Sequence, residues 1–233
     1  MAKLVIFDID GTLTNSNEVD AICYVRSLKD EFELNEIDES WETYKNVTDS
    51  GVLDEIFEQA FSRKPTESEI RRHIKRFIEL LEESCKKDSA SCEEIPGARN
   101  ILNLLRASSD WKIGIATGAW RESAVFKLKS AGIDIEKLPF VTGSNSKSRE
   151  DLLGKCIDAA KDYYGIDEFE RIVSVGDGVW DLRTAVNMKL PFIGINKPEK
   201  FSHLAKCMVL RDYTDAETFM RCLEEATVPV MLE

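Results

Sequence analysis

The stretch LVIFDIDGTLT, residues 4–14, decides the fold of this chain. Its first four residues are apolar without alternation, which is typical of a strand buried on both faces of a parallel sheet. Two aspartates, Asp8 and Asp10, follow at the end of this strand. Burying one carboxylate is costly, and two neighbouring carboxylates also repel each other. The pair therefore requires partners from other parts of the chain.

Further apolar runs rich in valine and isoleucine follow along the chain. After a first strand at residues 3–7, the expected strands cover residues 111–116, 138–143, 171–176, 191–195 and 207–211. Helical periodicity lies between and after them, over residues 121–132, 149–165, 181–189 and 214–226. Because strands alternate with helices, we expect an α/β fold with a doubly wound, mostly parallel sheet.

The stretch of residues 16–90 differs, because it contains no convincing strand. Helical patterns cover residues 18–32, 51–61 and 66–83. Thr66 and Glu69 form a capping box at the start of the last pattern. We therefore expect an all-helical cap domain over residues 16–90, inserted into an α/β core of residues 1–15 and 91–233.

The composition excludes several classes of protein. The chain has 233 residues, 43% of them hydrophobic, which is enough for a packed core. Its net charge of -12 repels phosphate backbones and anionic lipids, so neither nucleic acid nor a membrane is expected as a partner. No run approaches the ~18 apolar residues of a spanning helix, and no apolar signal stretch opens the sequence. We expect a cytoplasmic monomer or homodimer.

The six cysteines form no Cys-x-x-Cys pair, so neither a zinc site nor a redox motif is indicated. We expect scattered, reduced thiols, with a Cys85–Cys92 pair as the alternative. The two histidines, His73 and His203, have no serine or cysteine constellation around them, and neither is given a catalytic role.

Polar residues follow four of the expected strands, and the carboxyl ends of parallel strands meet at one edge of a sheet. These residues are Asp8, Asp10, Gly11, Thr117, Gly118, Lys147, Arg149, Asp177 and Asp181. Four carboxylates in one place require a cation, and Mg²⁺ prefers such oxygen ligands. One carboxylate can act as a nucleophile and a second can carry a proton. A hydroxyl, backbone N–H groups and a basic side chain can hold a phosphoryl group.

The motifs FDIDGT (7–12), ATG (116–118) and GDGVWD (176–181), with a basic residue before a helix, resemble the four motifs of the haloacid dehalogenase superfamily. Residues 16–90 resemble its helical cap. The resemblance covers about two-thirds of the chain and is nearest to the phosphoglycolate phosphatase-like branch. It implies a Rossmann-like core whose active site lies under the cap.

The resemblance also implies roles for the first motif. Asp8 would attack phosphorus and bind Mg²⁺. Asp10 would be the general acid and then the base for water, with its backbone carbonyl on the metal. Gly11 would let the backbone turn closely around the phosphate, because glycine adopts conformations closed to other residues.

The other motifs supply the remaining roles that the resemblance implies. Thr117 and the N–H of Gly118 would bind phosphate. Asp177 would be a direct metal ligand, and Asp181 would hold a metal-bound water or complete the ligand shell. The basic position has two candidates, Arg149 and Lys147. Arg149 is favoured, because it directly precedes the acidic residues that begin a helix.

Asp10 distinguishes among the reactions that the superfamily catalyses, because its dehalogenase and phosphonate-cleaving members lack an acid at this position. We therefore expect a Mg²⁺-dependent phosphatase that hydrolyses a small phosphorylated metabolite through an aspartyl-phosphate intermediate. The alternatives are a phosphomutase and a non-catalytic phosphate-binding regulatory protein. The cap residues that could face the substrate are Trp41, Tyr44, Thr48, Asp49 and Ser50, although this stretch could equally be a plain connection between helices.

Overall fold

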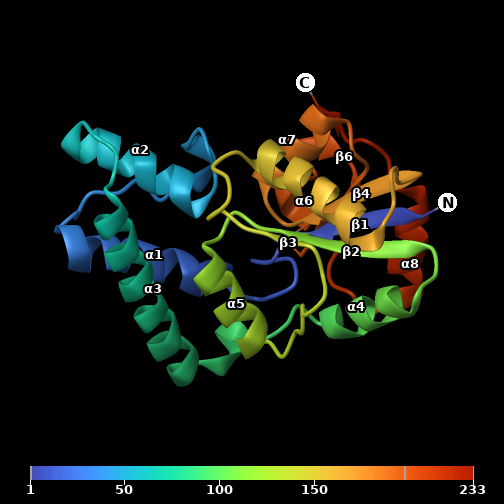
Figure 1. The fold of residues 1–233 in the computed structure, drawn as a ribbon, viewed down its shortest axis with the longest axis horizontal. Helices are drawn as coiled ribbons and strands as arrows, with labels where there is room; N and C mark the ends of the chain where they lie inside the picture. The colour runs from blue at the N-terminus through green and yellow to red at the C-terminus, as the bar shows by residue number, and fades with distance from the viewer. Residues whose placement is uncertain (1, 197, 233) are drawn as a thin grey trace.

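A six-stranded parallel sheet forms the centre of the computed structural model, which describes residues 2–196 and 198–232 (Figure 1). The strands are β1 (Lys3–Phe7), β2 (Trp111–Ala116), β3 (Phe140–Val141), β4 (Arg171–Gly176), β5 (Phe192–Ile195) and β7 (Met208–Leu210). Their order is β3-β2-β1-β4-β5-β7, so the chain starts in the middle, winds to one edge and then to the other. The predicted doubly wound α/β fold is confirmed.

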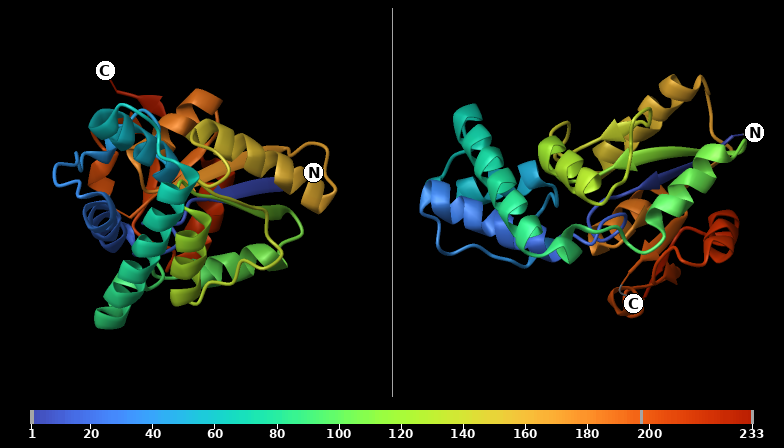
Figure 2. Two further views of the ribbon diagram at one scale, coloured as in Figure 1. Left: turned by 60° about the vertical axis from the view of Figure 1, so that its left-hand side comes forward. Right: turned by 90° about the horizontal axis from the view of Figure 1, so that it is seen from below.

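Helices cover both faces of this sheet. They are α4 (Ala98–Ala107), α5 (Arg121–Ser130), α6 (Arg149–Tyr164), α7 (Val179–Met188) and α8 (Ala216–Glu225). Leu4 and Ile6 of β1 pack with α6 residues, whereas Val5 and Phe7 pack in the cluster that α4, α5 and α8 share. Figure 2 (right) shows α6 and α8 on opposite sides of the sheet. The apolar run of β1 does not alternate because both of its faces are buried.

The strand register determines which loops meet at the carboxyl edge of the sheet. Phe7 at the end of β1 lies beside Ile115 of β2 and Val175 of β4. The residues that follow these three strands are therefore brought side by side. The winding direction of the chain reverses between β1 and β4. Open α/β sheets bind their ligands at the carboxyl ends of the strands beside such a reversal.

Three helices stand between β1 and α4 in the sequence, and Figure 1 shows them to one side of the sheet. This helical insertion consists of α1 (Asn17–Phe32), α2 (Asp49–Phe61) and α3 (Glu67–Lys87), with the 3₁₀ turns η1 (Trp41–Thr43) and η2 (Ser89–Cys92). Its apolar side chains form a cluster of their own, which Trp120 of the core joins. The capping box of Thr66 and Glu69 is present. The division into a core of residues 1–15 and 91–233 and a cap of 16–90 stays a prediction.

Some short elements differ from those expected. The expected strand 138–143 shortens to two residues, and the sequence analysis assigned no element to α4. β6 (Ala205–Lys206) pairs with β8 (Val230–Met231) in a separate antiparallel ladder, and η3 (Pro198–Lys200) follows β5. Within residues 2–196 and 198–232, no helix is both long and apolar enough to cross a membrane.

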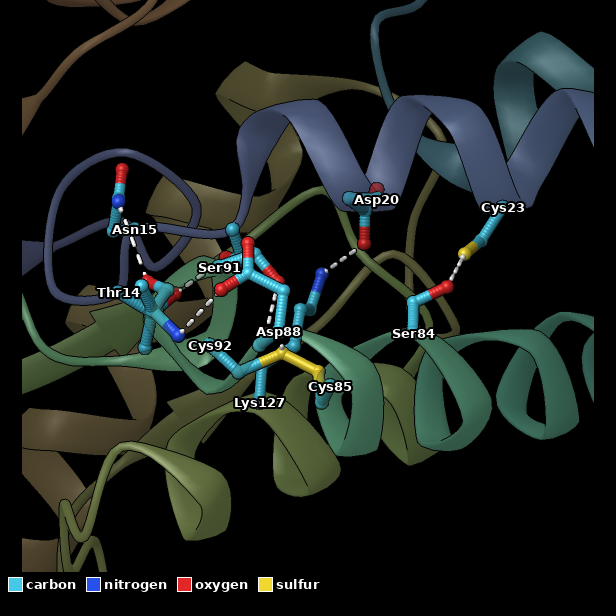
Figure 3. Close-up of a disulfide and its surroundings, with 12 residues drawn as sticks. Thr14, Asn15, Asp20, Cys23, Ser84, Cys85, Asp88, Ser91, Cys92 and Lys127 are labelled. Carbon is cyan, nitrogen blue, oxygen red and sulfur yellow. Dashed lines mark hydrogen bonds and ion pairs between the residues drawn. A yellow bond between two sulfur atoms is a disulfide. The ribbon is translucent and has the colours of Figure 1, made fainter.

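A disulfide joins Cys85 of α3 to Cys92 of η2 (Figure 3). Their Cα atoms lie 5.8 Å apart, because the chain turns back on α3 at this point. This separation is usual for a disulfide. The expectation that every cysteine is a reduced thiol is therefore wrong for this pair, and the alternative holds. The other four cysteines are free.

His73 is fully buried in the helical insertion, where its Nδ1 lies 2.9 Å from the Ser27 hydroxyl. Burial lowers the pKa of His73 to about 3, against about 6.5 in an unfolded chain. The unfolded state therefore takes up the proton first. The stability that depends on neutral His73 is present above pH ~6.5 and is lost as the pH falls towards 3.

We expect this one group to lower the free energy of unfolding by about 2 kcal/mol between roughly pH 7.5 and pH 5. Urea unfolding of the wild type and of His73→Asn at both pH values tests this, and the variant should lose less stability. His203→Asn replaces the other, exposed histidine and should keep the wild-type pH dependence. Equal pH dependence in His73→Asn and the wild type would contradict the assignment.

Candidate active site

Asp8 begins the site, one residue beyond the end of β1. Its backbone N–H donates to the Val175 carbonyl at 3.0 Å, which continues the pairing with β4 and fixes where the side chain starts. Arg149 Nη1 lies 3.3 Å from Asp8 Oδ1 and 3.2 Å from Asp181 Oδ1. Burial raises the pKa of Asp8 well above its ordinary value, the nearby charge of Asp181 adds to this effect, and Arg149 opposes it.

Asp8, Asp177 and Asp181 form a cluster of buried carboxylates, with one oxygen of each lying within 4.8 Å of the others. Asp177 Oδ2 accepts hydrogen bonds from Asn17 at 2.8 Å and from Lys200 at 2.9 Å. Asp177 Oδ1 is buried without a hydrogen-bond partner. Burial raises the pKa of Asp177, and it raises the pKa of Asp181 to about 6. The cluster is therefore short of positive charge.

Asp10 is held by two side chains. Ser16 Oγ donates to Asp10 Oδ1 at 2.5 Å, and Lys127 Nζ lies 2.7 Å from Asp10 Oδ2. Lys127 also pairs with Asp20 of α1 at 2.5 Å. Burial alone lowers the pKa of Lys127, but Asp10 and Asp20 outweigh burial and raise it above the ordinary value. Gly11 follows with φ 71°, a left-handed conformation that favours glycine.

The phosphate-binding candidates lie next to these carboxylates. Thr117 follows β2 and is 1% exposed, and a Cβ on Gly118 would lie 2.6 Å from Arg149 Nη2. The structure separates the two basic candidates. Arg149 contacts Asp8, whereas the Lys147 ammonium pairs with Asp54 of α2 and its side chain is half exposed. Arg149 belongs to the carboxylate cluster and Lys147 does not.

A cavity of about 100 Å³ opens onto Asp8 from the helical insertion. The described residues that line it are Asp8, Asp10, Asn17, Asp20, Ala21, Tyr24, Trp41, Val47, Thr48, Asp49, Val52, Thr117, Gly118, Ala119, Arg149 and Trp180. Trp41, Thr48 and Asp49 had been candidates for this surface. The other two candidates, Tyr44 and Ser50, are not among the lining residues: Tyr44 stacks on Trp41, and the Ser50 hydroxyl donates to the Gly143 carbonyl.

Residues 47–50, which we call the lid segment, tie the insertion to the strand-end loops. The Asp49 N–H donates to the Gly118 carbonyl, and the Trp120 N–H donates to Asp49 Oδ2, both at 2.8 Å. Arg149 Nε donates to the Val47 carbonyl at 2.6 Å. The Thr48 hydroxyl donates to the Lys147 carbonyl at 2.9 Å, and the Ser50 hydroxyl donates to the Gly143 carbonyl at 2.7 Å. These contacts join the lid segment to the loops after β2 and β3 and to the start of α6.

The sequence analysis missed several residues of the site. Asn17, Asp20, Ala21 and Tyr24 line the cavity from one face of α1, at the spacing i, i+3, i+4 and i+7. That spacing directly after the first motif is the signal that could have found them. Lys127 stands on the same face of α5 as buried Ala124 and Leu128, so a lysine within an apolar stripe was the second signal. Lys200 lies in no helical or apolar pattern of this kind, so the sequence carries no comparable signal for it.

The loops after β2 and β3 touch through their backbones, which makes Gly143 sensitive to substitution. The Gly143 N–H donates to the Ala119 carbonyl at 2.8 Å, and a Cβ at position 143 would lie 2.0 Å from the Gly118 oxygen. We expect Gly143→Ala to lower the free energy of unfolding by about 1–3 kcal/mol, as overpacking does.

Gly154→Ala is the matched control, because a Cβ on this α6 residue meets nothing within 4 Å. Alanine is the better helix former, so we expect this variant to gain up to about 1 kcal/mol. Urea unfolding of both variants measures the difference. Equal stabilities would show that the loop absorbs the extra methyl group.

The chain is similar to known proteins in sequence and in fold. Residues 2–189 match the sequence model of a protein family described as "haloacid dehalogenase-like hydrolase". PpaX of Clostridium perfringens (strain 13 / Type A), assigned as a pyrophosphatase, is 27% identical over 199 residues, which are 84% of each chain.

Solved structures agree on the fold. A hydrolase from Pseudomonas syringae superimposes with a TM-score of 0.69 at 21% identity, covering 93% of this chain and 97% of its own. The β-phosphoglucomutase of Clostridium difficile gives a TM-score of 0.67 at 17% identity, covering 97% of this chain and 98% of its own. With its family pattern matched over most of its length, this chain belongs to the haloacid dehalogenase-like hydrolases.

Proposed function

We propose that this chain is a Mg²⁺-dependent phosphatase of a small phosphorylated metabolite, with Asp8 as the nucleophile. One observation carries the proposal. Asp8 is a buried carboxylate at a strand end that lines a cavity, beside the Arg149 guanidinium and the Thr117–Gly118 loop. An anionic phosphoryl group placed there would meet a nucleophile, a fixed cation and backbone donors together.

The residues present fit a magnesium ion. Asp8, Asp177 and Asp181 offer only carboxylate oxygens, the ligands of a hard cation, and Asp177 Oδ1 is buried without a hydrogen-bond partner. The three would hold the ion, together with the backbone carbonyl of Asp10. Bound there, magnesium would supply positive charge to the phosphoryl oxygens and offset the repulsion among the carboxylates.

In the proposed reaction, side chains of this chain supply the nucleophile and the proton carrier, and water is the second substrate. A carboxylate oxygen of Asp8 forms a bond to phosphorus while the ester P–O bond breaks, and the leaving oxygen takes the proton of the Asp10 carboxyl group. Water then attacks the acyl phosphate and gives its proton to Asp10. The bond between phosphorus and Asp8 breaks, phosphate leaves, and both aspartates return to their starting forms.

The lining of the cavity supports hydrolysis over mutase chemistry. A mutase that works through a sugar bisphosphate must hold two phosphate groups at once. Among the lining residues that the structure describes, Arg149 is the one cation, and it already pairs with Asp8 and Asp181. A purely regulatory phosphate-binding protein would not need the acid–base candidate Asp10.

We expect Asp8→Asn to lower the kcat for phosphate release from p-nitrophenyl phosphate by about 1,000-fold or more, because an amide cannot form the acyl phosphate. Phosphate release with Mg²⁺, with EDTA, and with Mg²⁺ restored is the measurement. EDTA should abolish the wild-type activity and added Mg²⁺ should restore it.

Asp158→Asn is the matched control, an identical substitution of an exposed aspartate on α6. It should keep wild-type turnover. Wild-type turnover in Asp8→Asn would exclude Asp8 as the nucleophile. Phosphate binding without hydrolysis of any ester tested would favour a regulatory role instead.

A further inference from the structure

Lys127 is a fully buried lysine outside the cavity lining. It lies on α5 of the core with 0% of its side chain exposed, and its neighbours Ala124 and Leu128 belong to the sheet-facing apolar cluster. Its ammonium group pairs with Asp10 at 2.7 Å and with Asp20 at 2.5 Å; Figure 3 shows the contact with Asp20. A lysine is rarely buried completely unless paired charges compensate its lost hydration.

The geometry shows what this ammonium group does to Asp10. Both carboxylate oxygens of Asp10 accept from donors of the protein, Oδ1 from Ser16 and Oδ2 from Lys127. Two donors on opposite oxygens fix the plane of the carboxylate as well as its position. Lys127 does not line the cavity, so it acts on a substrate only through Asp10.

Asp20 extends the arrangement to the helical insertion. It stands on α1, so one buried ammonium group connects the first motif, a core helix and the first helix of the insertion. Asp20 also lines the cavity, beside Asp10. The orientation of Asp10 is therefore linked through Lys127 to the place that α1 takes over the site.

We propose that Lys127 is a positioning residue that orients the Asp10 carboxyl group for proton transfer to the leaving oxygen and anchors it to α1. The inference rests on the proposed phosphatase function. It predicts a loss that depends on the leaving group, because an alkoxide needs the proton of Asp10 and p-nitrophenolate leaves without one. A loss of folding or of general site structure would affect both leaving groups alike.

The experiment compares Lys127→Met with the wild type in the first turnover, with Mg²⁺ present, on p-nitrophenyl phosphate and on an alkyl phosphate such as glycerol phosphate. We expect the first-turnover rate on the alkyl ester to fall by about 100-fold or more, the usual scale of general acid catalysis. The rate of p-nitrophenolate release should fall by less than about one tenth of that factor. KM should change little for either ester.

Lys129→Met is the matched control, since Lys129 is exposed on the same helix, and it should behave as the wild type. Lys127→Arg keeps the charge and should recover part of the lost rate on the alkyl ester. If Lys127→Met does not fold, the double variant Lys127→Met with Asp20→Asn removes one buried carboxylate together with the ammonium group and allows the same comparison.

Equal losses on the two esters, or no loss relative to Lys129→Met, would overturn the role of Lys127 while the proposed function stands. A wild-type chain that hydrolyses neither ester in the presence of Mg²⁺, nor any other phosphate ester, would instead overturn the proposed function, and this inference with it. The two failures are therefore distinguishable in one set of measurements.

Discussion

The balance between carboxylates and cations at the carboxyl edge of the sheet governs this structure. Six acidic side chains meet there: Asp8, Asp10, Asp20, Asp49, Asp177 and Asp181. Three cations pair with five of them: Arg149, Lys127 and Lys200. Like charges that are buried together repel each other and destabilise the fold. Each of these cations therefore has to be held close to the carboxylates that it pairs with. The three lie on α5, on α6 and in η3, three elements that pack around the sheet.

Much of the fold could be predicted from the sequence because its signals are local. A strand buried on both faces has a continuous apolar run, as β1, β2 and β4 do, and these three strands have the predicted bounds. β3 was predicted as a longer strand at residues 138–143, whereas the two-residue strands β6 and β8 carry too little pattern to be recognised. Their existence depends on which segments the tertiary fold places side by side. The helix α4 was missed although Ile101, Leu102 and Leu105 have helical spacing.

The residues of the candidate site also divide into those that the sequence predicts and those that it does not. The residues that follow strand ends were found, because the topology of a parallel sheet brings them to one edge. Whether Arg149 or Lys147 reaches that edge depends on side-chain direction at the start of α6, which spacing alone does not determine. Lys127, Asp20 and Lys200 were missed because a charge looks the same in a sequence whether it is solvated or buried. The Cys85–Cys92 pairing likewise depends on the turn after α3.

The five hydrogen bonds of the lid segment stabilise the closed arrangement, in which this segment is bonded to the loops after the strands. Each such bond contributes about 0.5–1.5 kcal/mol net, so together they favour the closed arrangement by roughly 3–7 kcal/mol. An arrangement in which the segment has released all five bonds would therefore be the minor one. A ligand that must pass the lid segment, between Val47 and Ser50, meets mostly closed molecules, and its apparent affinity falls by the open fraction. The Asp8 side chain lies in a cavity beside this segment and is 6% exposed, so the bonds that slow the entry of a ligand also help to shield the nucleophile candidate from solvent.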